Sequence, residues 1–409
     1  MIFPIFYLIA SAYKIRNFWL ICSLTITNWL LHAYLKDILL FNDINISGFY
    51  SLFLILILLP YFLKNLTIKS RPYDLIVLLL FLLFLSIFLT SIVAKYKVPH
   101  IRGMAHYFSL FILYIVLYKK YLKSAITYVP TIISYVGIAS ILFYMFEIFI
   151  YSSDSYVFKA SIGWVFQLKG IVGGTAANDS VGLFLVTLPF VLLKFKNNKL
   201  LFYSIIILSF LIVIQTHTRM AWIGLPILLF VYLSQINRIN IRYLVTVFIF
   251  GYFTFIYIVA PNFEMLSTRL LATDITNQSE TLVYRINMWN AIISQVFNQT
   301  LFLGVGAYWT KITIETIAHN IFFEMLVWGG IWALLILIFI ICYLIFIFFK
   351  YKNKINDDNR FLYITSFSSI LAYFIWGMTA NAWIPVGFLL FLLNLLVVQN
   401  ILLIHKDRQ

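Results

Sequence analysis

The chain reads IFFEMLVWGGIWALLILIFIICYLIFIFF from Ile321 to Phe349, with Glu324 as the only charged residue of the stretch. About 17 to 25 mainly apolar residues are enough to cross the hydrocarbon core of a bilayer as a helix. The rest of the 409-residue chain is similar, since 63% of it is hydrophobic and only 11% is charged. Such a composition is too apolar for water and predicts an integral membrane protein with many spans.

Runs of this kind predict an all-α, polytopic fold with about twelve transmembrane helices. They lie near 17–35, 48–63, 73–94, 104–118, 125–150, 175–193, 200–216, 220–236, 243–260, 321–349, 361–378 and 382–404. The division is nine helices over 1–260, a large outer loop over 261–320 and three helices over 321–409, all in one integrated membrane domain. Because 200–216 and 220–236 are nearly contiguous, we expect these two helices to form a tight hairpin.

The formal net charge of +15 would suit a protein that binds nucleic acid, yet the Lys and Arg residues lie in short clusters between the apolar runs. Such clusters hold cytoplasmic loops against anionic lipid, so membrane lipids are the expected partner and nucleic acid is excluded. With the amino terminus inside, nineteen Lys and Arg residues fall on the inner side and ten on the outer side. This asymmetry follows the positive-inside rule and places the loop over 261–320 outside.

The outer loop from Pro261 to Asn320 has helix-like apolar spacing, at Leu282, Ile286, Trp289, Ile292 and Ile293. Long loops in compact proteins are usually functional or disordered. The aromatic and aliphatic content of this loop argues against disorder. We therefore predict a small helical subdomain on the outer side.

Arginines on the predicted outer side are candidates for binding an anionic, phosphorylated substrate. Arg219 lies at the tip of the expected hairpin, and Arg285 lies in the helix-like part of the long loop. A guanidinium is a planar fork of donors that matches a phosphate group. The alternatives are an interfacial anchor for Arg219 and a solvated loop side chain for Arg285. Arg102 and Arg269 face the same side and are weaker candidates.

His319 and Asn320 lie where the long loop re-enters the membrane at the start of an apolar helix. A helix amino terminus favours anions, and a histidine with an ordinary pKa near 6.5 can accept a proton. The alternative is that one of the two residues caps the helix. The pair Gly304 and Gly306 predicts a tight turn.

Signals for other chemistries are absent, so we expect neither a cofactor nor a metal. The sequence has no phosphate-binding Gly-rich loop, no His-Glu-x-x-His helix and no Cys-x-x-Cys pair. Cys22 and Cys342 lie inside apolar runs, and the acidic pair Asp357-Asp358 lies in a lysine-rich inner loop.

The pattern resembles the O-antigen ligase and O-antigen polymerase superfamily over roughly residues 215–333. The resemblance rests on Thr218-Arg219-Met220-Ala221-Trp222, Arg285 with Trp289, Gly304-Val305-Gly306, and His319-Asn320 followed by nine residues and Gly330. One departure is Ala333, where the histidine motif of the ligases usually ends in glycine, threonine or tyrosine.

The resemblance implies a GT-C-like, inverting, metal-independent glycosyltransferase of the bacterial inner membrane, with its active site facing the periplasm. The donor would be a glycan on undecaprenyl diphosphate. The acceptor would be the lipid A-core in a ligase, which the histidine motif favours, or a second lipid-linked glycan in a polymerase. Arg219 and Arg285 would hold the diphosphate, Asn320 would assist in substrate binding, and His319 would be the base on the acceptor hydroxyl.

Two other classes are alternatives. A transporter or lipid flippase predicts charges near the middle of the membrane and commonly an internal repeat; the sequence has few such charges and no visible repeat. A structural scaffold would leave Arg219, Arg285 and His319 replaceable.

Overall fold

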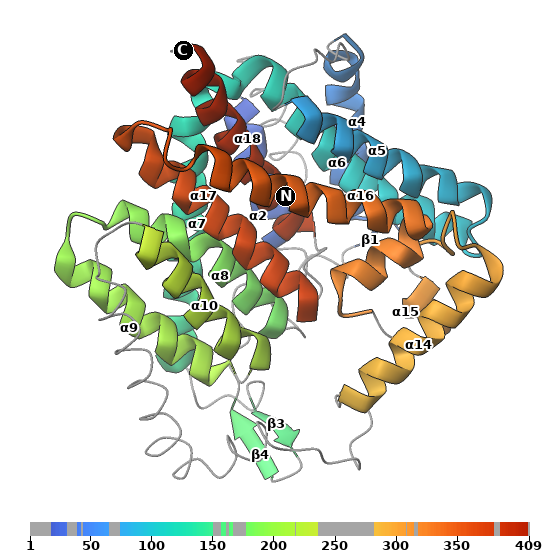
Figure 1. Ribbon diagram of the computed structural model, residues 1–409. Coiled ribbons are helices and arrows are strands. Elements are labelled where there is room, and N and C mark those ends of the chain that lie inside the picture. The colour runs from blue at the N-terminus through green and yellow to red at the C-terminus, as the bar shows by residue number, and fades with distance from the viewer. Residues whose placement is uncertain are drawn as a thin grey trace.

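A computed structural model of the chain describes residues 18–30, 39–41, 44–64, 74–149, 157–160, 163–166, 177–216, 218–235, 282–307, 309–314, 318–379 and 385–407. Helices dominate this part of the chain (Figure 1). They are α2 (Phe18–Leu30), α4 (Ile46–Lys64), α5 (Asp74–Leu89), α6 (Lys97–Tyr121), α7 (Ala125–Phe149), α8 (Ala177–Lys194), α9 (Lys199–Gln215), α10 (Arg219–Gln235), α14 (Leu282–Gln299), α15 (Trp309–Thr313), α16 (Ile321–Tyr351), α17 (Asp357–Thr379) and α18 (Pro385–Asp407).

The remaining elements of the described part are short. Two 3₁₀ turns, Thr90–Ile92 and Leu122–Ser124, follow α5 and α6. Two small antiparallel hairpins pair β1 (Leu39–Phe41) with β2 (Ile44–Asn45) and β3 (Val157–Ala160) with β4 (Gly163–Phe166). The predicted all-α fold class is confirmed, because these hairpins contribute no layer to the helical bundle.

Every predicted span overlaps a helix except 243–260, which lies outside the described residues. The helix expected over 104–118 is longer than predicted, since α6 begins at Lys97. Five helical stretches in the described part are long and apolar enough to cross a membrane: Asp74–Ile92, Lys97–Glu147, Ile321–Tyr351, Asn359–Met378 and Pro385–Asp407. The chain is a multi-pass membrane protein, and the count of twelve spans and the three-part division stay predictions.

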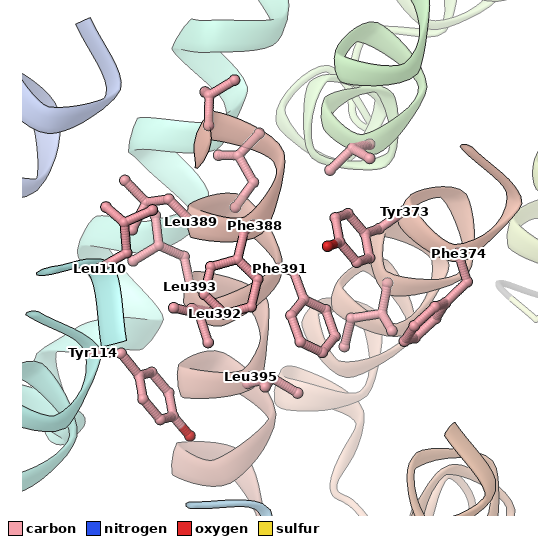
Figure 2. Packing of buried hydrophobic residues seen from close by; sticks show 14 of the residues in the cluster. Leu110, Tyr114, Tyr373, Phe374, Phe388, Leu389, Phe391, Leu392, Leu393 and Leu395 are labelled. Carbon is pink, nitrogen blue, oxygen red and sulfur yellow. The ribbon is translucent and has the colours of Figure 1, made fainter. Parts of the chain in front are cut away.

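The helix α18 lies at the centre of the packing. Every residue from Val386 to Leu402 is buried, as expected of a helix that is hydrophobic on all sides. Figure 2 shows its aromatic side chains among residues of α6 and α17. Phe391 stacks on Tyr373 with ring centroids 4.9 Å apart, and Phe388 meets Phe84 edge to face at 5.9 Å.

Neutral amides of α18 add hydrogen bonds within this apolar centre. Gln399 Oε1 accepts from the Tyr114 hydroxyl at 2.9 Å, and Asn394 Nδ2 donates to Ser369 Oγ at 2.9 Å. Ser369 in turn donates to the Val186 carbonyl at 2.6 Å. Polar side chains that bond across helices are a common means of association inside membranes. They link α18 to α6, α17 and α8.

Contacts at the helix ends agree with the predicted alternation of sides. At the predicted inner side, Lys352 Nζ donates to Gln235 Oε1 at 3.4 Å. At the predicted outer side, Asn320 Nδ2 donates to the Met378 carbonyl at 3.0 Å. Residues assigned to the same side therefore meet, although they are far apart in the sequence. Which of the two sides faces the cytoplasm stays a prediction.

The helix α16 bends at Gly330, whose φ of 68° and ψ of −161° are not helical. A regular helix would pair the Ile331 N–H with the Val327 carbonyl. Here Ile331 N donates instead to the Leu301 carbonyl at 2.8 Å. The bend therefore exchanges a bond within the helix for a bond to the loop that precedes α15.

The same loop also takes up the carbonyl that the bend releases. Val327 O accepts from the N–H groups of Val305 and Gly306, both at 2.9 Å. Gly304 and Gly306 have φ of 73° and 101°, so the turn predicted from this glycine pair is present. A Cβ on Gly304 would lie 2.5 Å from Val327 O and 2.7 Å from Gly330 N. Two backbone segments thus touch where glycines allow it.

We predict that Gly330→Ala lowers the melting temperature of the detergent-purified protein. A side chain would hold a φ of 68°, which costs about 1 to 3 kcal/mol, and its Cβ would lie 2.5 Å from the Phe302 carbonyl. Leu335→Ala is the control, because it shortens an exposed side chain five residues further along α16. Equal melting temperatures for Gly330→Ala and the unchanged protein would contradict the role given to the bend.

Candidate active site

His319 lies in the turn before α16 and has a φ of 51°, the one positive φ among the described residues that are not glycine. Positive φ is uncommon for residues with a side chain, although histidine is among those enriched there. The side chain is partly buried. Such a backbone persists only where neighbouring contacts hold it in place.

Both backbone groups of the preceding residue, Ala318, are bound by side chains. The Ala318 N–H donates to Glu324 Oε1 at 2.9 Å, and the Ala318 carbonyl accepts from Trp289 Nε1 at 2.9 Å. The Trp289 ring also stacks on Phe323, with centroids 5.1 Å apart and planes within 13°. Glu324 and Phe323 belong to the first turn of α16, whereas Trp289 belongs to α14.

Asn320, the following residue, is the amino-terminal cap of α16. Its side-chain oxygen accepts from the N–H groups of Phe322 at 2.9 Å and Phe323 at 3.4 Å. Its amide nitrogen donates to the Met378 carbonyl at the end of α17. The capping alternative is therefore confirmed for Asn320. Its predicted part in substrate binding stays a prediction.

Arg285 reaches the same turn from α14. This helix buries Met288, Ile292 and Val296 at successive turns and packs on α16, beside its amino-terminal part in Figure 1. Arg285 is one turn before Trp289, and residues four apart share a helix face. Burial and, second, the positive charge of Arg285 lower the pKa of His319 from 6.5 to about 4. The imidazole is therefore neutral at physiological pH, beside a fixed cation.

The hairpin expected before Arg219 is present. α9 ends at Gln215 and α10 begins at Arg219. Thr216 and Thr218 are buried in the turn with their hydroxyl oxygens 3.1 Å apart, and Trp222 Nε1 donates to the Val213 carbonyl at 3.0 Å. These contacts fix where α10 starts.

The other predicted arginines are not brought to His319 by the described structure. The side chain of Arg219 and the whole of Arg269 lie outside the described residues. Arg102 is exposed on α6. The roles given to these three arginines stay predictions.

Two residues near the site were missed by sequence reasoning. One is Glu324, the charged residue of the apolar stretch from Ile321 to Phe349, whose position in the first turn after a histidine was a signal. The other is His100, which is buried in α6. Its Nδ1 accepts from the Ala307 N–H at 2.8 Å, so its other nitrogen carries the proton and donates to the Ile87 carbonyl at 3.2 Å. His100 thus attaches the glycine turn to α5 and α6.

The turn at His319, the cation on α14 and the hairpin before α10 all fall in one segment that has known relatives. Residues 204–338 match the O-Antigen ligase family. Over 230 residues the chain is 26% identical to the ComP-specific O-oligosaccharyltransferase of Acinetobacter baylyi, which covers 52% of this chain and 41% of that protein. The chain thus spans less than half the length of this relative. The family resemblance predicted from the sequence is confirmed.

Within the segment that matches the O-Antigen ligase family, the described geometry supplies an uncharged base within electrostatic reach of a cation. A neutral imidazole can take a proton, and a guanidinium can bind an anion or stabilise one that forms. Among the residues that the structure describes, no group of three His, Cys, Asp or Glu side chains is placed to hold a metal ion. The chemistry that the imidazole and the guanidinium support together is proton transfer next to a negative charge.

We predict that Arg285→Gln raises the pKa of His319 from about 4 towards 6.5. A neighbouring cation disfavours the imidazolium, so its removal makes the proton easier to hold. The pH dependence of His319 modification by diethyl pyrocarbonate, followed by peptide mass spectrometry, reports this pKa because only the neutral ring reacts. Arg102→Gln is the control and leaves the profile unchanged. An unaltered profile for Arg285→Gln would show that the two side chains do not interact.

Proposed function

We propose that this protein transfers a glycan from a polyprenyl diphosphate carrier, undecaprenyl diphosphate, to an acceptor hydroxyl. The proposal is carried by one observation: the neutral imidazole of His319 lies within electrostatic reach of Arg285 in a segment that matches the O-Antigen ligase family. The reaction needs those two functions, a base for the hydroxyl and a cation for the diphosphate. The protein acts in the bacterial inner membrane, with this site on the periplasmic side.

In the proposed step, His319 removes the proton of the acceptor hydroxyl as its oxygen attacks the anomeric carbon of the donor. The bond from that carbon to the diphosphate oxygen breaks, and the leaving diphosphate keeps the electron pair. Arg285, with Arg219 as its predicted partner, stabilises the charge that grows on this group. Attack opposite to the leaving group inverts the anomeric carbon. The energy is stored in the sugar–diphosphate bond, so the step requires neither ATP nor a metal.

The charge of Arg285 also makes the strength of the base respond to the donor. Burial and Arg285 lower the pKa of His319 to about 4, which makes it a weak base. A bound diphosphate offsets the charge of Arg285 and adds negative charge nearby, and both effects favour the imidazolium. His319 thus becomes a stronger base once the donor is in place, which suits general base catalysis near neutral pH.

Two kinds of acceptor fit this proposal. The first is a sugar hydroxyl of the lipid A-core, as in O-antigen ligation, with a second lipid-linked glycan as the variant found in polymerases. The other is a hydroxyl of a ComP-like acceptor, which is suggested by the relative that is named a ComP-specific O-oligosaccharyltransferase. We give preference to the lipid A-core because the matching family is described as O-Antigen ligase.

We predict that His319→Ala lowers glycan transfer by about a hundredfold or more, the usual contribution of a general base. The measurement is transfer in vesicles that contain the purified protein and lipid-linked donor, with lipid A-core, lipid-linked glycan or ComP offered in separate reactions. The control is His405→Ala at the opposite end of the bundle, which retains activity. Full turnover by His319→Ala with every acceptor would end the proposal, and the acceptor used by the unchanged protein decides between the alternatives.

A further prediction for this function concerns the dependence of the rate on pH. The acid limb of kcat/KM reports the pKa of the base in the free enzyme, and the acid limb of kcat reports its pKa in the donor complex. We expect the kcat/KM limb near pH 4 and the kcat limb at a higher pH, because the donor raises the pKa of His319. Arg285→Lys keeps the cation and should keep the separation. Coincident limbs in the unchanged protein would contradict the coupling between donor and base.

A further inference from the structure

We infer that Trp289 and Glu324 are positioning residues that hold His319 in its reactive conformation beside Arg285. The inference rests on the proposed function, since it concerns the base of that reaction. Neither side chain needs to touch the substrate. Each acts through the backbone of Ala318, to which both are hydrogen-bonded at 2.9 Å.

The Ala318 carbonyl and the His319 N–H belong to one planar peptide group. The hydrogen bond from Trp289 fixes that carbonyl and with it the plane of the peptide group. The direction of the His319 backbone then depends only on its φ. The observed φ of 51° is intrinsically unfavourable for a residue with a Cβ. Without the hydrogen bonds of Trp289 and Glu324 to Ala318, the φ of His319 would relax towards negative values and the imidazole would point in another direction.

Glu324 binds the other backbone group of Ala318, its N–H. Its carboxylate accepts from the Ala318 N–H, while its own helix begins four residues earlier at the cap Asn320. His319 therefore lies between two anchored neighbours, Ala318 before it and Asn320 after it.

Trp289 has a second effect because Arg285 lies on the same helix face, one turn earlier. The bond from the indole to the Ala318 carbonyl sets the position of α14 against the turn, and the stack of Trp289 on Phe323 supports it. The contact that shapes the backbone at His319 thus also sets how close Arg285 comes to the imidazole. Trp289 thus determines both the backbone conformation at His319 and the position of Arg285 relative to it.

Glu324 acts by its hydrogen bond and not by its charge. Among the residues that the structure describes, Arg285 on α14 and burial are what shift the pKa of His319, and Glu324 on α16 is not a cause of the shift. A neutral acceptor at position 324 should therefore serve as well as a carboxylate. This separates a positioning role from an electrostatic one.

The test uses the full-length protein in the vesicle assay. Trp289→Phe keeps an aromatic ring against Phe323 but loses the N–H donor, and we expect kcat to fall about tenfold with KM within about twofold, as for one lost hydrogen bond. The pKa of His319 should rise in this variant as Arg285 moves away. Glu324→Leu should lower kcat to a similar extent, and Glu324→Gln should restore it to within about threefold while leaving that pKa unchanged. Trp332→Phe, an exposed tryptophan of α16, is the matched control.

The outcomes separate the two proposals. Full kcat and an unchanged His319 pKa in Trp289→Phe, with His319→Ala inactive, would overturn the positioning role and leave the proposed function standing. Equal loss in Glu324→Gln and Glu324→Leu would show that the charge matters and would overturn the role given to Glu324. Activity of His319→Ala itself would remove the proposed function. Melting temperatures are measured for all variants, so that a loss of stability can be told from a loss of kcat. If Trp289→Phe is unstable, the comparison of Glu324→Gln with Glu324→Leu, whose side chains are similar in size, still tests the positioning role.

Discussion

Backbone groups inside a bilayer have no water to bind, so an interruption of a membrane helix must be satisfied by other protein groups. The bend of α16 at Gly330 releases the Val327 carbonyl and the Ile331 N–H, and the loop over 301–306 binds both. Glycines at 304 and 330 let the two backbones come this close. The bend and the loop are therefore one structural unit, and neither conformation would be stable without the other.

This unit determines where the site lies. The part of α16 before the bend carries the turn with His319, and the loop that fills the bend connects α14 to α15 (Figure 1). Because α14 leads directly into that loop, its position follows from the same hydrogen bonds. Arg285 and His319 are 34 residues apart in the chain. They come together because α14, which carries Arg285, leads into the loop bound at the bend, and His319 precedes the part of α16 before the bend. Thr90, in the 3₁₀ turn after α5, donates to the Leu303 carbonyl, and His100 of α6 accepts from the Ala307 N–H. The loop is therefore also attached to this turn and to α6.

The sequence predicts the helices well because hydrophobic length is the strongest signal in a membrane chain, and it predicted α14 because apolar residues recur there at helical spacing. It also indicated Arg285 and His319 as partners, through a family resemblance. It could not show that Glu324 binds the Ala318 N–H, because that contact exists only when His319 adopts a positive φ. The bond between His100 and Ala307 joins residues 207 positions apart, and no local pattern announces such a pairing.

A base made weak by its surroundings has a physical use in this setting. The proposed donor is an activated glycan, and a general base is useful only when that glycan is in place to be attacked. Burial and Arg285 keep His319 a weak base, and the proposed diphosphate would offset the charge of Arg285. The donor would then complete the catalytic group as well as supply the glycan. This proposed arrangement requires a histidine that stays oriented towards Arg285, and the hydrogen bonds of Trp289 and Glu324 to Ala318 would serve that requirement.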